Sequence, residues 1–422
     1  MGVAGDDGYH KTRGARSCLH SENPRLAWGP LRWYLLNAMG SHPLSFASLD
    51  FATTPFLVIW EVTQACGLAC QHCRAEAIDR RDPRELSTEE GRDLLHQIKE
   101  MGTPVCVLSG GDPLQRDDLA ELVRHGKGLG LRMATIPAAT DRLTRQRLAE
   151  LKDAGLAQVA FSLDGSTAEL HDGFRQVPGT YAKTMQAIEW AHELQIPVQI
   201  NTTFARYNCH DVDALLALVE RLGVVFWEVF SLVPVGRGTV LPSLDASEHE
   251  ELFAKLYELS QRVSFVIKVT EAPHYRRYVL HQRAKDGRGA SGPHGHLPVH
   301  SGSAVPAQLS RELSTHESFG MRAKGINSGK GFCFVSHQGE VMPSGFFPRA
   351  VGDVRERPLS QIYRESELFL ELRDPTRLKG RCGRCEFADV CGGSRARAWA
   401  VHGDWFAEDP ACLYDPPPRP SR

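Results

Sequence analysis

Residues 56–73 read FLVIWEVTQACGLACQHC, and this stretch carries the strongest information on both fold and chemistry. Its first seven residues are almost wholly apolar, as in a strand that is buried on both faces of a parallel sheet. Three cysteines, Cys66, Cys70 and Cys73, follow with C-x3-C-x2-C spacing. Ligands of parallel α/β sheets gather at the carboxyl ends of the strands, so we expect this cysteine loop at the functional edge.

This apolar run is the first of six that alternate with helical patterns. The other five cover residues 105–110, 132–136, 158–165, 198–204 and 224–233. Ser87 and Glu90 form a capping box that predicts the start of a helix between the first two runs. Further helical patterns cover residues 115–129, 144–154, 180–194 and 210–222. The alternation predicts an α/β fold, either a partial or full barrel or a doubly wound sheet.

The composition is that of an ordinary soluble protein of two or three domains, with 422 residues, 42% of them hydrophobic and 24% charged. A net charge of −2 gives no electrostatic case for nucleic acid. We find no apolar run of about 18 residues that predicts a membrane span and no secretory signal at the N-terminus. The cysteines are clustered, which favours metal over disulfides in such a chain, and we expect a cytoplasmic protein.

The three early cysteines, which we call the early triplet, suggest an iron–sulfur cluster. A four-iron cluster normally takes four thiolates, so a triplet would leave one iron without a protein ligand. Such an open position can bind and activate another molecule, as it does in a catalytic zinc site. Two alternatives stay open, namely three buried thiols that only pack, and a zinc site that lacks its usual second pair of ligands.

A glycine motif completes a resemblance to a known family. Gly110, Gly111, Asp112 and Pro113 follow the second predicted strand. Together with the early triplet they make the chain similar to the radical S-adenosylmethionine (SAM) superfamily. The resemblance implies that the triplet holds a 4Fe-4S cluster bound to SAM, whose reductive cleavage gives a 5′-deoxyadenosyl radical that abstracts a substrate hydrogen. The glycines suit an approach of the SAM amino group to the backbone. Asp112 stands where the family more often has Glu.

Polar residues after later strands resemble further SAM contacts of this superfamily. Ser162 and Asp164 match residues that contact the SAM ribose or carboxylate. Asn201, in INTT, and residues 233–238, VPVGRG, match positions near the nucleoside. Each also has a plain structural interpretation, because Asp164 with Gly165 suits a turn and Asn201 could satisfy buried backbone groups.

Four cysteines near the C-terminus, which we call the late quartet, suggest a second cluster. They are Cys382, Cys385, Cys391 and Cys412. Their spacing resembles the SPASM or twitch extension of radical SAM enzymes, which carries auxiliary 4Fe-4S clusters. Ser344 and Ser394 stand at or near positions where a full SPASM domain has further cysteines, so the resemblance implies one auxiliary cluster, for electron transfer or for structure. We interpret Cys333 as a small core residue in a strand.

The resemblance implies a partial (β/α)6 TIM-like barrel with a small, cysteine-rich, SPASM/twitch-like iron–sulfur domain. We predict an N-terminal extension at residues 1–45 and a radical SAM core at 46–270. A linker or cap would follow at 271–325, where Gly, Ser, His and Pro are abundant. The auxiliary-cluster domain would cover residues 326–422.

Within the superfamily, the chain resembles the tetrapyrrole branch of haem d1 formation and the alternative haem route. HCRAEA (72–77), APHYRR (272–277) and GFCFVSHQGEVMPSGF (331–346) carry this resemblance. It implies a tetrapyrrole substrate and oxidative decarboxylation of two iron-coproporphyrin III propionates to vinyl groups, giving haem. Carboxylates need cations, and Arg pairs with them through two hydrogen bonds. The candidate contacts are Arg74, Arg206, Arg276, Arg277, His274, Tyr275 and His337.

Two other functions stay open. Maturases of ribosomally made peptides share the late cysteine spacing, although residues 1–45 show no pattern of a leader-binding domain. A non-catalytic iron–sulfur carrier or sensor would have no need of the glycine motif. The electron donor is not identifiable from the sequence.

Overall fold

The structure is a computed structural model that describes residues 49–285 and 325–417. The predicted extension at residues 1–45 and residues 286–324 of the predicted linker lie outside these ranges. The described residues form a nine-stranded sheet in the order β7-β6-β5-β4-β3-β2-β1-β8-β9. The strands are β1 (Leu57–Glu61), β2 (Val105–Ser109), β3 (Arg132–Thr135), β4 (Gln158–Ser162), β5 (Val198–Phe204), β6 (Phe226–Ser231), β7 (Val266–Thr270), β8 (Phe332–Val335) and β9 (Val341–Met342).

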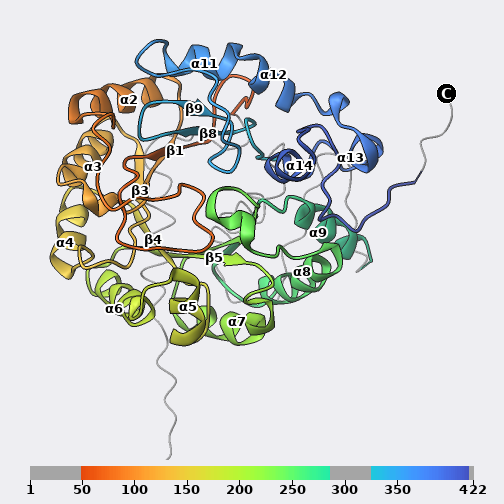
Figure 1. The fold of residues 1–422 in the computed structure, drawn as a ribbon, viewed down its shortest axis with the longest axis horizontal. Helices are drawn as coiled ribbons and strands as arrows, with labels where there is room; N and C mark the ends of the chain where they lie inside the picture. Colours follow the sequence, from red (N-terminus) through yellow and green to blue (C-terminus); the bar gives the residue numbers. More distant parts are fainter. Residues whose placement is uncertain (1–48, 286–324, 418–422) are drawn as a thin grey trace, which may run out of the picture.

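The sheet is the curled sheet of a partial barrel. Strands β1 to β7 pair in parallel with their neighbours in chain order, β8 joins β1 in parallel, and β9 is antiparallel to β8. Figure 1 shows the helices as a ring around the strands. The predicted α/β fold class is therefore confirmed as a partial TIM-like barrel.

Helices follow the strands much as the sequence predicts. The predicted capping box of Ser87 and Glu90 begins α2, with both of its hydrogen bonds formed. The main helices are α2 (Thr88–Glu100), α3 (Leu119–Gly128), α4 (Arg145–Asp153), α5 (Ala168–Arg175), α6 (Thr180–Glu193), α7 (Val212–Arg221), α8 (Ala246–Ser260), α9 (His274–Lys285), α11 (Leu359–Glu365), α12 (Glu367–Arg373), α13 (Gly380–Arg384) and α14 (Arg395–His402). Short 3-10 turns are η2 (Pro113–Gln115), η3 (Cys209–Asp211), η4 (Gly236–Val240) and η5 (Pro375–Arg377).

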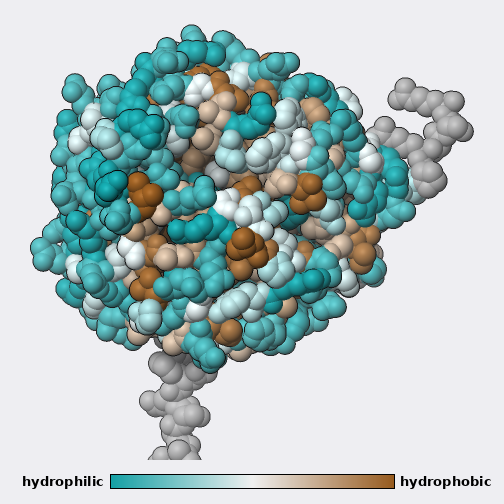
Figure 2. Space-filling view, in the orientation of Figure 1, coloured by the Kyte–Doolittle hydropathy of each residue, from teal (hydrophilic) through white to brown (hydrophobic). Residues whose placement is uncertain are grey.

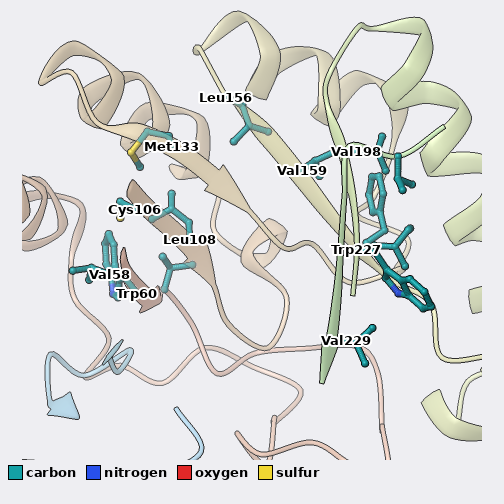
Figure 3. Close-up of a cluster of buried hydrophobic side chains, with 14 of the residues drawn as sticks. Val58, Trp60, Cys106, Leu108, Met133, Leu156, Val159, Val198, Trp227 and Val229 are labelled. Carbon is teal, nitrogen blue, oxygen red and sulfur yellow. The ribbon is translucent and has the colours of Figure 1, made fainter. Parts of the chain in front are cut away.

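Alternate residues of each strand pack between the sheet and the helices. Val58 and Trp60 of β1 are fully buried and pair in register with Cys106 and Leu108 of β2 (Figure 3). Ile59, between them, is only half-buried because it points to the open interior of the barrel. The core thus lies on the helix side of the sheet, and the interior remains accessible at the strand ends.

The sheet is wider than the six predicted strands. Strand β7 escapes the apolar pattern because Lys268 interrupts it, and Lys268 Nζ pairs with Glu228 of β6 at 2.7 Å. Strand β8 comes from the predicted auxiliary domain and pairs Cys333 with Val58. Cys333 is fully buried there, as expected of a core residue. The domain boundaries themselves stay predictions.

Within residues 49–285 and 325–417, no helix is long and apolar enough to cross a membrane. The face seen in Figure 1 is largely hydrophilic at its rim, and hydrophobic residues gather inside that rim (Figure 2).

Candidate active site

The early triplet lies in the loop after β1. Cys70 is buried, and Cys66 and Cys73 are partly exposed. The pKa of Cys66 is raised to about 12, first by burial and then by the negative charges of Asp112, Cys70 and Cys73. Such repulsion requires groups that lie near one another. The three thiols of the loop therefore lie close enough to interact electrostatically.

Segment 233–238, after β6, contacts this loop. Arg237 Nε donates to the carbonyl of Cys70 at 3.0 Å, and its backbone N–H donates to the carbonyl of Cys73 at 3.0 Å. Gly236 has a φ of +54°, and a Cβ there would lie 2.7 Å from the Cys73 carbonyl oxygen. These contacts fix the cysteine loop, and the predicted nucleoside contact of this segment stays a prediction.

The glycine motif lies against the residues just before Cys66. A Cβ on Gly110 would come within 2.6 Å of the Thr63 carbonyl oxygen, and one on Gly111 within 2.5 Å of the Ala65 carbonyl oxygen. The Gly111 N–H donates to the Thr63 carbonyl at 2.8 Å. Only glycine permits this approach, which joins the ends of β1 and β2.

The carboxylate of Asp112 is fully buried, and its hydrogen-bond partners belong to neighbouring loops. It accepts hydrogen bonds from Thr140 Oγ1 at 2.6 Å, Leu114 N at 3.1 Å and Ala138 N at 3.2 Å. Pro113 follows as the first residue of η2. Burial raises the pKa of Asp112 in spite of these bonds. Asp112 therefore shapes the turn that presents the glycines.

At the ends of β4 and β5, Ser162 pairs with Asn201 in register. Asp164, two residues later, is buried and accepts from the Thr203 N–H at 2.8 Å. It also forms an ion pair with Arg175. Burial alone would raise the pKa of Asp164, but the Arg175 guanidinium outweighs burial and leaves it below its usual value.

Arg175, at the end of α5, is a residue that the sequence did not single out. Its Nη1 lies 3.6 Å from Cys70 Sγ, while its Nη2 contacts Asp164. Asp164 thus orients a cation onto one thiol of the early triplet. Arg175 lies in the segment LDGSTAELHDGFRQVPG (163–179), but no local pattern in it shows that α5 returns to the cysteine loop.

The late quartet lines one cavity, so the structure brings all four predicted cysteines together. Other residues of the cavity wall are His274, Arg277, Arg381, Asp409 and Tyr414. Burial raises the pKa of Cys412 to about 11 and raises that of Cys382. Cys382 Sγ accepts from the Asp409 N–H at 3.4 Å and from Arg395 Nη2 at 3.7 Å. Such N–H groups stabilise a thiolate.

A single metal ion needs several ligand side chains close together. Within the described part of the chain, no three His, Cys, Asp or Glu side chains are grouped as such an ion requires. Zinc holds sulfur at about 2.3 Å, so its thiolates crowd together, whereas a four-iron cube spreads its thiolates further apart.

The predicted substrate cations separate into two kinds. Three of them are engaged elsewhere. Arg206 is bound to Asp245 and Glu248. Arg276 donates to the carbonyls of Val390 and Ile326 at 3.0 and 2.7 Å, and Arg277 pairs with Glu250 at the late quartet's cavity.

Arg74, directly after Cys73, is the candidate that lies at the early triplet. It pairs with Glu61 at 2.9 Å and stacks over the Phe334 ring at 4.5 Å. His337 Nδ1 lies 2.8 Å from the other oxygen of Glu61. Glu61 therefore joins Arg74 and His337 at the end of β1. His274 and Tyr275 are also buried, and His274 lines the cavity of the late quartet.

Comparison with known proteins agrees with this arrangement. The Radical SAM superfamily model matches residues 60–219. The AdoMet-dependent heme synthase of Oleidesulfovibrio alaskensis is 40% identical over 86% of this chain and 89% of that protein. The Fe-coproporphyrin III synthase of Methanosarcina barkeri is 32% identical over 84% of this chain and 87% of that protein.

A solved structure supports the fold. Streptococcus suis SuiB bound to S-adenosylmethionine superposes with a TM-score of 0.64 at 14% identity, covering 86% of this chain and 78% of that chain. The chain therefore belongs to the radical SAM superfamily, in the branch that contains the AdoMet-dependent heme synthases and the Fe-coproporphyrin III synthase.

Proposed function

We propose that this radical SAM enzyme converts two propionates of iron-coproporphyrin III to vinyl groups. The observation that carries the proposal is the 40% identity to an AdoMet-dependent heme synthase along nearly the whole of both chains. Each propionate would lose a hydrogen atom to the 5′-deoxyadenosyl radical, which becomes 5′-deoxyadenosine. It would also lose one electron to a one-electron acceptor, for which the proposed auxiliary cluster is the candidate. The bond to the carboxylate carbon would then break, which releases CO2 and leaves a vinyl group.

In this proposal the early triplet would hold a 4Fe-4S cluster, and the glycine motif would take the methionine end of SAM. The convergence of three thiols fits three irons of a cube, and the fourth iron is left for SAM. Gly110 and Gly111 pack against the backbone of Thr63 and Ala65, which places the glycine motif beside the start of the cysteine loop. When bound, the cluster and SAM supply the hydrogen-abstracting radical.

The chain's own residues would prepare this site. Arg237 holds the carbonyls of Cys70 and Cys73, and Arg175 places positive charge beside the Cys70 sulfur. Positive charge there stabilises the thiolate that an iron ligand must become. We propose that Ser162, Asp164 and Asn201 contribute to the SAM site as predicted, with Asp164 acting through Arg175.

The late quartet would hold one auxiliary 4Fe-4S cluster. Four thiols line one cavity, and N–H groups already point at Cys382, which suits a cluster with four protein ligands. Such a cluster would supply one-electron transfer. Arg74, one of the cations at the early triplet, pairs with Glu61 through Nη2 and would bind a substrate carboxylate through its remaining N–H groups.

The test is anaerobic incubation of the reduced protein with SAM and iron-coproporphyrin III, followed by mass analysis of the tetrapyrrole and of 5′-deoxyadenosine. We expect a product that has lost two carboxyl groups, with deoxyadenosine formed alongside. An unchanged tetrapyrrole, with deoxyadenosine formed only in the presence of a peptide, would favour the maturase alternative.

A further inference from the structure

Glu271 follows the last residue of β7 and has an unusual backbone. Its φ of +58° lies in the left-handed region, which residues other than glycine rarely adopt. The conformation is held from outside, because Arg397 Nη2 donates to the Glu271 backbone carbonyl at 2.6 Å. Strained backbone of this kind clusters at functional sites.

Two serines hold the carboxyl group of Glu271. Ser394 Oγ donates to Oε2 at 2.5 Å, and Ser344 Oγ donates to Oε1 at 3.3 Å. Each hydroxyl oxygen also accepts a backbone N–H, from Arg397 at 3.0 Å and from Phe346 at 3.1 Å. With both serines donating, the carboxyl group accepts a hydrogen bond at each of its two oxygen atoms. In this arrangement, a proton on the carboxyl group is left for a further partner.

The surroundings favour the neutral form of this carboxyl group. It forms no ion pair with a Lys or Arg of residues 49–285 or 325–417. The nearby Arg397 guanidinium is shared by Asp409, at 3.3 Å, and Ser231, at 2.5 Å. Burial, and then the charge of Asp409, raise the pKa of Glu271 more than Ser394 and Arg397 lower it.

Ser344 connects Glu271 with the early triplet. The next residue, Gly345, lies so close to Arg74 that a Cβ would come within 2.9 Å of Arg74 Nε. Arg74 directly follows Cys73. One side of the Glu271 carboxyl group therefore belongs to a chain of contacts that ends at the proposed SAM cluster.

Ser394 connects Glu271 with the late quartet. The preceding residue, Gly393, is so close to Cys382 that a Cβ would lie 3.1 Å from Cys382 Sγ. Glu271 is thus linked by contacts to both cysteine groups, and the residue is partly exposed. A partly exposed side chain can be reached by a bound molecule.

We propose that Glu271 is a neutral carboxylic acid that donates a hydrogen bond to a propionate of the substrate, in the space between the early triplet and the late quartet. The proposal rests on the proposed function and adds a specific substrate contact to it. An ionised carboxyl would repel a propionate, whereas a neutral one forms a short O–H···O⁻ bond. Enzymes are known to keep a carboxylic acid neutral for such donation.

The test is equilibrium binding by the full-length holoprotein under anaerobic conditions. Two probes are used, iron-coproporphyrin III and metal-free coproporphyrin III. For Glu271→Ala we expect both dissociation constants to rise about 10- to 100-fold, as for the loss of a hydrogen bond to a charged group. Glu271→Gln keeps a donor and is expected to stay within about threefold of the wild type. Exposed Glu189 provides the matched control, Glu189→Ala, with unchanged binding.

The outcomes separate the two proposals. If the wild type neither binds nor converts iron-coproporphyrin III, both fall. If it does both and Glu271→Ala binds equally well, the role of Glu271 alone is wrong. Equal losses in Glu271→Gln and Glu271→Ala would show that negative charge is needed, and a loss confined to the iron-containing probe would show a contact with the metal. Either result overturns the proposal.

Infrared spectroscopy covers the case in which Glu271→Ala does not fold. On addition of metal-free coproporphyrin III, the wild type should show a shifted carbonyl band of a neutral carboxylic acid, and Glu271→Gln should lack it. A spectrum with no such band in the wild type would contradict a neutral Glu271.

Discussion

The early triplet and the late quartet use the same side chain in different surroundings. The triplet lies in one loop after β1, next to a glycine motif that packs against the backbone of Thr63 and Ala65. The quartet gathers four thiols from a longer stretch of chain around one cavity. In the proposed function, this difference decides which cluster has an iron free for SAM. The number of thiols in a group and the residues around them therefore indicate the role of a cluster better than the number of cysteines in the chain does.

The largest effect is expected from removing one ligand of each group. Cys66→Ala should reduce 5′-deoxyadenosine formation to background, because the triplet has no spare ligand. Cys412→Ala should lose iron from the late quartet while the SAM-binding cluster remains. Product analysis together with iron assay checks both variants. Equal retention of SAM cleavage in the two would remove the functional distinction between the groups.

The next largest effect, a loss of folding stability, is expected at the ion pair of Arg175 and Asp164. Arg175→Gln leaves Asp164 as a buried charge without its partner and should cost about 3–5 kcal/mol of unfolding free energy. Chemical denaturation measures the loss. The added change Asp164→Asn should recover part of it, since no buried charge then remains. An Arg175→Gln protein as stable as the wild type would contradict the pairing.

The same pair predicts a pH dependence. The pKa of Asp164 lies below its usual value in the folded protein, so the pair stabilises the fold at neutral pH. This contribution should begin to fall below the unfolded value of about 3.9 and disappear as the pH drops through the folded pKa. Arg175→Gln should flatten that part of the stability profile.

The glycine motif should be more sensitive to an added methyl group than an unhindered helical glycine. Gly111→Ala puts a Cβ 2.5 Å from the Ala65 carbonyl oxygen, and the forced shift should cost about 1–3 kcal/mol and weaken SAM binding. Gly128→Ala, at the end of α3, meets nothing within 4 Å and is the matched control. It should be neutral or slightly stabilising. Comparable SAM affinity in the two variants would argue against a ligand site at Gly111.

The smallest effect is expected at a cysteine that belongs to neither group. Cys333 is buried in β8 beside Val58, so Cys333→Ala should cost about 1 kcal/mol through lost packing. Iron content should stay unchanged. Loss of iron in this variant would make Cys333 a ligand and reduce the contrast between cluster and core cysteines.

Local patterns in the sequence predicted the parts of the fold that depend on local forces. The six apolar runs became β1 to β6 because a buried parallel strand needs apolar residues on both faces. The capping box was predictable because its two hydrogen bonds join residues only three positions apart at the start of α2. The return of β8 to β1 was not predictable, because strand pairing across more than 270 residues leaves no local pattern.

In the site, too, local patterns were predictable and long-range contacts were not. The cysteine spacing indicated both cysteine groups. The glycine motif was predicted as the SAM site next to the early triplet. The roles of Arg175, Arg237 and Glu271 depend on contacts between residues far apart in the chain, which single-sequence patterns do not contain. Ser344 and Ser394 were noticed as missing cysteines, but only the structure shows that both donate to one carboxyl group.

Spectroscopy of the reconstituted protein, with and without SAM, tests the difference between the two cysteine groups most directly. We expect about eight irons per chain, four for each cube, and a change on SAM addition in the Mössbauer and electron paramagnetic resonance signals of one cluster only. That change should be absent in Cys66→Ala and present in Cys412→Ala. A SAM response that persists in Cys66→Ala, or that requires Cys412, would contradict the assignment of the open iron to the early triplet.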